Sequence, residues 1–101
     1  MEKLTKDITV LDEYLSRQTD HTDSERTLMQ TIKLSEEVGE LCEVVLQETG
    51  GQMRSKAAKE LDVGSEIADV IICTLLMAER FNVDTWEEVD KKMQKVLARM
   101  N

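Results

Sequence analysis

The chain has 101 residues, which is the size of a single domain with one hydrophobic core. Its net charge of −8 argues against a protein that binds nucleic acid polymers through a basic face, but it is compatible with a nucleotide whose phosphates are screened by metal ions. Proline is absent, glycine occurs four times and no apolar run is long enough to cross a bilayer, so long helices with short connections and no membrane partner are expected.

The first half of the sequence predicts two helices. Apolar residues recur at helical spacing from Thr5 to Gln18, and a polar connector follows. Thr22 and Glu25 have the spacing of a capping box, in which each side chain accepts a hydrogen bond from the other residue's backbone N–H. The second helix is therefore expected to begin here and to run to about Glu48, because the pair Gly50-Gly51 stops it.

The second half predicts two further helices. One begins near Met53 and ends near Phe81, and the sequence leaves open whether Gly64 kinks or breaks it. Asp84 and Glu87 form a second capping-box pair, which starts the last helix. The apolar residues of that helix fall on one stripe: Trp86, Val89, Met93, Val96, Leu97 and Met100. Residues 1–101 are interpreted as a single all-α domain of the four-helix bundle type.

Two acids of the second helix, Glu37 and Glu40, have unusual positions. A helical wheel centres the apolar face of this helix on Leu34, Val38, Leu41 and Val45. Glu37 lies on the flank of that face and Glu40 just beyond it, whereas Glu36 projects nearly opposite. Residues three apart are neighbours on a helix, so these two like charges repel unless a cation joins them. An acid pair at this spacing is also common on a solvated helix face, so the pair alone does not establish a site.

The third helix carries the second acidic pair. Residues 67–78 are apolar nearly all round, which predicts that the segment is buried, and Asp69 is its only charge. An unpaired buried carboxylate is costly, so Asp69 is expected to have a partner. Glu66 lies one turn earlier on the same face, and no Lys or Arg occurs between Gly64 and Glu79. A distant cation would explain Asp69 alone but not the acids of the second helix.

Two antiparallel helices would bring the pair Glu37 and Glu40 against the pair Glu66 and Asp69. Four carboxylates are hard oxygen ligands, which suit Mg²⁺, with Mn²⁺ as a substitute. The sequence therefore predicts a four-carboxylate Mg²⁺ site between the second and third helices.

These residues resemble the signature of a known family. Ser-Glu-Glu-Val-Gly-Glu-Leu at residues 35–41 and Glu-Ile-Ala-Asp-Val at residues 66–70 are similar to the EExxE and ExxD motifs of MazG-like nucleoside triphosphate pyrophosphohydrolases. The resemblance extends from about Leu28 to Arg99. It implies an all-α NTP pyrophosphatase fold, assembled as a homodimer or a dimer of dimers. It also implies a Mg²⁺-dependent enzyme that cleaves a (deoxy)nucleoside triphosphate between the α and β phosphates to give the monophosphate and pyrophosphate. Cleansing of the nucleotide pool is its expected task, and the preferred base stays unassigned.

The motif match also implies roles for individual residues. Glu37, Glu40, Glu66 and Asp69 would hold the metal, and either Glu37 or Glu40 would activate the attacking water as the catalytic base. Glu36 matches the first motif acid, and its outward position suggests a supporting role behind the metal ligands or between subunits.

Cations are expected to complete the phosphate site. Lys33 lies one turn before the acids, and Lys92, Lys95 and Arg99 follow one flank of the last helix. Relatives often carry an Asn near the position of Val96, and its absence weakens the assignment of that flank. A solvated face that complements the helix dipole explains the same three cations equally well.

The base-binding residues stay unassigned, because relatives often use an aromatic or a histidine near the N-terminus and this chain offers only Tyr14 and His21. His21 lies in the polar connector and is expected to be exposed. Trp86, Cys42 and Cys73 are expected to be core residues, and reduced thiols fit a cytoplasmic protein.

Two alternative functions remain open at this stage. A phosphoribosyl-ATP pyrophosphatase would carry the same signature acids, which do not separate the two substrates. A non-enzymatic helical oligomer that serves as an adaptor would instead have acids that are merely solvated.

Overall fold

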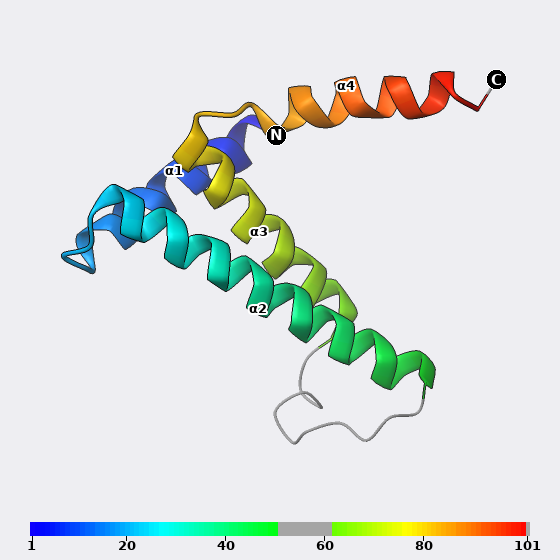
Figure 1. The fold of residues 1–101 in the computed structure, drawn as a ribbon, viewed down its shortest axis with the longest axis horizontal. Helices are drawn as coiled ribbons and strands as arrows, with labels where there is room; N and C mark the ends of the chain where they lie inside the picture. The colour runs from blue at the N-terminus through cyan, green and yellow to red at the C-terminus, as the bar shows by residue number, and fades with distance from the viewer. Residues whose placement is uncertain (51–61, 101) are drawn as a thin grey trace.

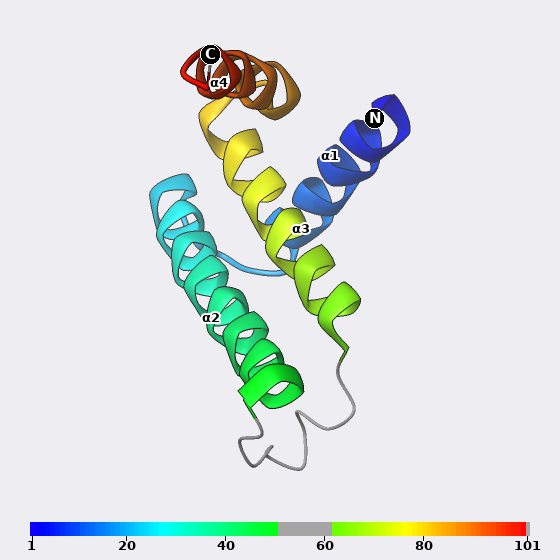
Figure 2. The same ribbon diagram turned by 90° about the vertical axis from the view of Figure 1, so that its right-hand side faces the viewer.

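The computed structural model describes residues 1–50 and 62–100, and these residues form four helices. They are α1 (Glu2–Arg17), α2 (Asp23–Gly50), α3 (Val63–Phe81) and α4 (Thr85–Ala98) (Figure 1). No strand occurs in the described part of the chain, so the all-α prediction is confirmed. α2 and α3 lie side by side and antiparallel, α1 packs against α3, and α4 runs away from the α2–α3 pair (Figures 1 and 2).

The capping box predicted before α2 is present. The Thr22 backbone N–H donates to Glu25 Oε1 at 2.8 Å, and the Glu25 N–H donates to Thr22 Oγ1 at 3.2 Å. α1 begins at Glu2, one turn earlier than predicted, because nothing between Met1 and Thr5 breaks a helix and the negative charge of Glu2 favours a first turn.

The start of α3 differs from the prediction. Asp62 is extended (φ −115°, ψ 161°), and its side chain accepts a hydrogen bond from the Ser65 N–H at 2.6 Å, so a new helix begins at Val63. The break that the sequence left open at Gly64 therefore falls at Asp62, and residues 53–61 of the predicted helical segment lie outside the described residues. Gly64 falls in the first turn of α3 and does not interrupt it.

The end of α3 is a left-handed cap. Asn82 has φ 55° and ψ 45°, and its N–H donates to the carbonyls of Ala78 and Glu79. The Val83 N–H also donates to the Ala78 carbonyl, at 2.9 Å. This is the Schellman pattern, and asparagine is the residue other than glycine that adopts its left-handed conformation most readily. The chain then turns to Asp84, whose side chain caps α4 by accepting from the Glu87 N–H at 3.2 Å.

The hydrophobic core lies where α1 crosses α3. Ile8, Leu75 and Leu76 are buried, and four half-buried side chains pack against them: Leu4, Leu11, Ile72 and Trp86. The core role predicted for Trp86 is confirmed, as is that of Cys73, but Cys42 is exposed. Both cysteines are free.

Apolar faces of α3 and α4 remain uncovered in a single chain. Ile67 and Ile71 are each 44% exposed, so the prediction that α3 is buried all round is wrong, because α1 and α2 cover only part of its surface. Beyond Trp86, the stripe of α4 is exposed at Val89, Met93, Val96, Leu97 and Met100. Among the described residues, no helix combines the length and the apolar character needed to cross a membrane.

Candidate metal centre

The face that α2 turns toward α3 carries an acid. Glu37 is 6% exposed and Val44 1%, whereas Val38 and Val45, predicted to lie at the centre of the apolar face, are 42% and 39% exposed. α2 is therefore rotated about its axis relative to the wheel prediction, so that the flank of the apolar arc meets α3. This rotation places Glu37 inside the interface between the two helices.

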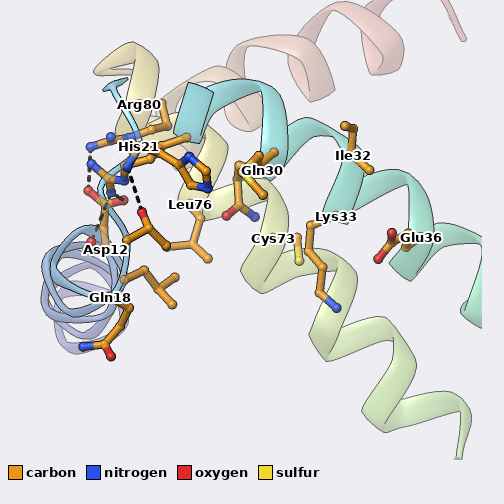
Figure 3. A pocket seen from close by; sticks show the side chains of 14 residues that line it. Asp12, Gln18, His21, Gln30, Ile32, Lys33, Glu36, Cys73, Leu76 and Arg80 are labelled. Atoms are coloured by element: carbon orange, nitrogen blue, oxygen red, sulfur yellow. Dashed lines mark hydrogen bonds and ion pairs between the residues drawn. The ribbon is translucent and has the colours of Figure 1, made fainter. Parts of the chain in front are cut away.

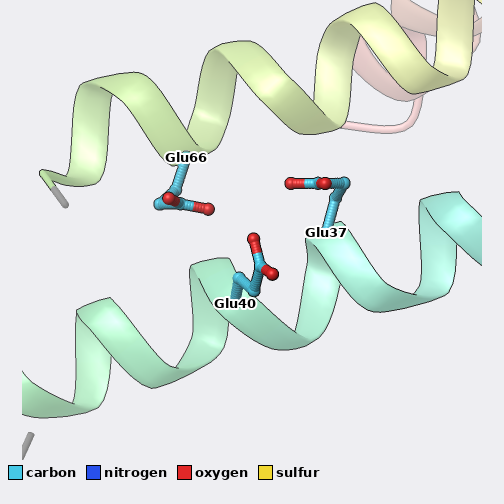
Figure 4. Close-up of side chains that lie close together, drawn as sticks. All are labelled: Glu37, Glu40 and Glu66. Carbon is cyan, nitrogen blue, oxygen red and sulfur yellow. The ribbon is translucent and has the colours of Figure 1, made fainter. Parts of the chain in front are cut away.

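Three carboxylates converge in this interface. Glu37 and Glu40 project from α2, and Glu66 projects from α3 toward them (Figure 4). One oxygen of each carboxylate lies within 4.8 Å of one oxygen of the other two. Oxygens this close repel when charged, unless a proton or a cation lies between them.

Glu66 is the deepest member of this cluster. It is completely buried, and neither of its carboxylate oxygens has a hydrogen-bond partner among residues 1–50 and 62–100. Glu37 Oε2 is also buried without a partner. Buried polar atoms are almost always hydrogen-bonded, so three orphaned oxygens at one point indicate a ligand that accepts their lone pairs.

Lys33 is the cation that the structure places on the cluster. Its Nζ lies 2.9 Å from Glu37 Oε1, and this hydrogen bond raises the pKa of Lys33. Among the described residues, the three carboxylates and this one ammonium group leave two negative charges uncompensated. A divalent cation has the charge and the preference for hard oxygen ligands that this residue set requires, so the residues present fit a Mg²⁺-type ion.

Electrostatics within the cluster favour protonation when no metal is bound. Burial raises the pKa of Glu66, and the neighbouring charges of Glu40 and Asp69 raise it further. The charge of Glu37 raises the pKa of Glu40. The metal-free site therefore holds protons more tightly than free carboxylates do, and a metal ion has to displace them.

Asp69 lies beside this cluster. It is half-buried on α3 and does not belong to the set of oxygens within 4.8 Å, but its charge contributes to the raised pKa of both Glu66 and Glu40. The sequence ranked Asp69 first as the isolated charge of a buried segment. In the structure the buried, unpartnered acid is Glu66, and Asp69 stays a predicted ligand.

The other predicted site residues lie outside the cluster. Glu36 is exposed. Lys92 and Lys95 belong to α4, which runs away from the α2–α3 pair, and Arg99 caps the C-terminal end of that helix (Figure 1). Arg99 Nε donates to the Lys95 carbonyl at 3.4 Å. Within one chain the structure thus brings together Glu37, Glu40, Glu66 and Lys33, with Asp69 nearby.

A cavity of about 500 Å³ opens beside Lys33, between α1, α2 and α3 (Figure 3). His21 and Glu36 line it, whereas Tyr14 does not. Its other lining residues include Cys73, which the sequence assigned to the core. They also include Gln30 and an ion-pair network of Asp12 with Arg26 and Arg80, which the sequence did not single out. No spacing rule would have found them, because they are brought together from three helices by the packing.

The raised carboxyl pKa values predict how stability depends on pH. Without metal, stability is expected to fall as the pH rises above 4.5, the ordinary pKa of Glu66, because the folded protein then binds more protons than the unfolded chain. The lowered pKa of Glu25 has the opposite effect, but below 4.5. Melting temperatures measured in EDTA between pH 4.5 and 8 test this. Saturating Mg²⁺ should remove the decline, and a flat profile in EDTA would contradict it.

Comparison with known proteins identifies one relationship. The model of the MazG-like family matches residues 28–101, a segment that contains all four predicted metal ligands and excludes α1. No curated protein and no solved structure matches the sequence.

Proposed function

The chain belongs to the MazG-like family, and from this membership and the carboxylate cluster we propose that it is a Mg²⁺-dependent nucleoside triphosphate pyrophosphohydrolase. The reaction would cleave a (deoxy)nucleoside triphosphate between the α and β phosphates, and it would release the monophosphate and pyrophosphate. The observation that supports this most strongly is Glu66, a fully buried acid whose two oxygens lack partners and face two further carboxylates. An adaptor protein with solvated acids has no use for such a group.

Glu37, Glu40 and Glu66 would hold Mg²⁺, with Asp69 as the fourth carboxylate. When bound, Mg²⁺ neutralises phosphate charge and lowers the pKa of a coordinated water. Glu40 is the exposed member of the cluster, whereas Glu37 is buried with one oxygen bonded to Lys33. We therefore assign to Glu40 the role of accepting the proton of the water that attacks the α phosphorus.

Lys33 is the phosphate-binding cation that the geometry supports best. Its ammonium group lies at the edge of the cluster and orients Glu37 through the 2.9 Å contact. There it can also stabilise negative charge that develops on a bridging phosphate oxygen. Lys92, Lys95 and Arg99 would reach a phosphate only from a second copy of the chain, because α4 leaves the α2–α3 pair.

We also propose that the protein assembles with itself, as a dimer or a pair of dimers. Large apolar side chains are exposed along α2, α3 and α4, including Leu28, Ile32, Leu46, Ile67, Ile71 and Leu97. Exposed apolar faces of this extent on a small domain mark an interaction surface. Since all three faces belong to the same chain, a second copy can cover them symmetrically. Two free thiols fit the reducing cytoplasm as its location.

The test of this function is a pyrophosphate-release assay over the common and several modified NTPs and dNTPs, with phosphoribosyl-ATP included. We expect one equivalent each of monophosphate and pyrophosphate in Mg²⁺ and none in EDTA. Turnover of phosphoribosyl-ATP alone would identify the alternative enzyme. No turnover of any compound, together with no effect of Mg²⁺ on the melting temperature, would favour the adaptor.

A further inference from the structure

α2 carries a second apolar line, on the side opposite to the one that it turns toward α3. Leu28, Ile32 and Leu46 belong to this line, and all three are exposed. Residues along it are spaced alternately four and three apart, which is the heptad spacing of a helix that packs lengthwise against another helix. We call this line the α2 seam, and its members are Leu28, Ile32, Ser35, Gly39, Cys42 and Leu46.

The exposed stripe of α4 has the same spacing. Val89, Met93 and Val96 follow one another at four and three residues, and Met100 continues the line in the turn after the helix. These four residues form the α4 seam, and all of them are exposed. The caps on both sides of the turn between α3 and α4 fix the direction of α4, which points away from its own α2 (Figures 1 and 2). The two seams therefore do not meet within one chain.

The charges beside the two seams have opposite signs. Glu36 directly follows a residue of the α2 seam, and Lys92 directly precedes a residue of the α4 seam. These are heptad positions e and g, whose side chains form ion pairs between two helices that run in the same direction. Both residues are exposed, and neither forms an ion pair among residues 1–50 and 62–100. The neighbouring Lys91, in contrast, lies 3.4 Å from Glu87 of its own helix.

Pairing these two charges sets one register for α4 of one copy along α2 of another. Met93 then meets Ile32, so two exposed apolar side chains cover each other. In the same register Met100 falls opposite Gly39. A Cβ added at Gly39 would meet nothing within 4 Å, so the long side chain of Met100 finds open space there. The register that satisfies the charges therefore also fits the sizes of the side chains.

Neither seam fits a second copy of itself as well. Two α4 helices in opposite directions would bring Lys92 beside the same basic flank, and two α2 helices would do the same with Glu36. In the same direction, Lys92 would meet Leu97 and Glu36 would meet Thr31, so the charges would stay unpaired. Only α4 of one copy on α2 of another joins opposite charges.

We propose that α4 of one chain packs along the α2 seam of a second chain, in the same direction, and that Lys92 of the first chain pairs with Glu36 of the second. In a two-fold dimer this contact occurs twice. The inference rests on the self-assembly included in the proposed function, to which it assigns the surfaces. It gives the first acid of the EExxE motif a role between subunits. Because α2 carries Glu37 and Glu40 on its other sides, each copy supports the helix that holds two metal ligands of the other.

Sedimentation equilibrium of the full chain in EDTA measures this dimer without any catalysis. Glu36→Lys and Lys92→Glu are each expected to raise the dissociation constant of the dimer by about tenfold or more, because each change replaces two attractive contacts per dimer by repulsive ones. An equimolar mixture of the two variants should dimerise about as tightly as the unaltered protein. In the mixed dimer both contacts again join opposite charges, which happens only if the paired residues belong to different chains.

Two further variants separate the seam from general charge effects. Lys91→Glu makes the same charge change as Lys92→Glu on the side of α4 that faces away from the seam, so it should change the dissociation constant by less than about twofold. Met93→Asp places a charge in the middle of the α4 seam and should leave the protein monomeric. Circular dichroism checks that each variant is folded, and the substituted side chains are all exposed.

A protein that stays monomeric at every concentration would overturn the proposal, as would a Met93→Asp variant that dimerises as tightly as the unaltered chain. Dissociation constants that neither charge variant changes, or a mixture that does not restore the dimer, would place the contact elsewhere and overturn it too. If the mixture restores the dimer but no triphosphate is cleaved in Mg²⁺, the proposed reaction fails while the interface stands. Turnover by a protein that is only monomeric would show the reverse.

Discussion

Replacing Glu66 by glutamine is expected to lower Mg²⁺-dependent pyrophosphate release by more than about 100-fold, and to raise the melting temperature of the metal-free protein. Changes in groups that merely orient a metal ligand cost about 10–100-fold, and loss of a ligand should cost more. Stability changes in the opposite direction because the amide is neutral. In the metal-free protein Glu66 is a buried acid without a partner, close to two other carboxylates. Removing its charge relieves desolvation and repulsion together.

Opposite signs for activity and stability separate this prediction from a simple folding defect. The measurements are pyrophosphate release at saturating Mg²⁺ and melting temperature in EDTA at pH 8, where the carboxylates are most charged. Glu13→Gln is the matched control, because Glu13 is an exposed acid on α1 and its loss changes the net charge equally. That variant should leave both quantities nearly unchanged.

The variant Asp69→Asn tests whether Asp69 contributes to activity and stability as much as Glu66, the other acid of α3. If Asp69 is a ligand, its loss should also reduce activity, but the gain in stability should be smaller than for Glu66→Gln because Asp69 is only half-buried. Full activity of Glu66→Gln would show that the carboxylate cluster is not the active site. Full activity of Asp69→Asn would remove Asp69 alone from the ligand set.

Local sequence signals predicted the helices well because their causes are local. The reciprocal bonds of Thr22 and Glu25 and the cap at Asp84 depend on residues three apart, and the structure contains them. The start of α3 was missed although Asp62 and Ser65 have the same spacing. The apolar and helix-favouring residues before Asp62 concealed this cap, since a helix pattern continues through them.

The sequence alone could not predict which face of each helix packs against its neighbour. A wheel places Glu37 on the flank of an apolar arc, but the arc of α2 is wider than one partner helix covers, and the pattern cannot say which edge faces α3. In the structure the edge that carries the acids faces α3, so Glu37 is buried and Val38 is exposed. The same choice makes Glu66 rather than Asp69 the deepest acid. The carboxylates were predictable as a group, while their burial depended on tertiary packing.

Replacing Asp12 by alanine is expected to destabilise the protein by about 3 kcal/mol, near the lower end of the range for removing one partner of a buried ion pair. Asp12 joins three helices, since its carboxylate lies 3.1 Å from Arg26 of α2 and 2.7 Å from Arg80 of α3. The three side chains are only 13–17% exposed. Without Asp12, the two nearly buried guanidinium groups would keep only the exposed carboxylate of Asp23, which lies 3.4 Å from Arg26 and 3.6 Å from Arg80 and screens their repulsion weakly.

Urea unfolding at a fixed protein concentration measures this effect, and Asp7→Ala is the control on the same helix. Asp7 pairs with Lys3 at 2.9 Å, but the two side chains are 58% and 89% exposed, so its loss should cost less than about 1 kcal/mol. Equal losses for the two variants would contradict the role given to Asp12. The double variant Asp12→Ala, Arg80→Leu should recover part of the stability, because it removes one of the two cations that have lost the Asp12 carboxylate.

The Asp12 variant also tests whether the ion-pair network and the carboxylate cluster are independent of each other. Asp12 holds Arg80 against α1 through the 2.7 Å contact of its carboxylate. Without this anchor, α1 would remain attached to α3 mainly through the apolar contacts around Ile8, and Arg80 would lose its fixed orientation. The carboxylate cluster lies on the other side of Lys33 and shares no residue with this network. Mg²⁺ should therefore still raise the melting temperature of the Asp12→Ala variant, by about as much as it does for the unaltered protein. Loss of the Mg²⁺ effect in the folded variant would show instead that the two sites are not independent.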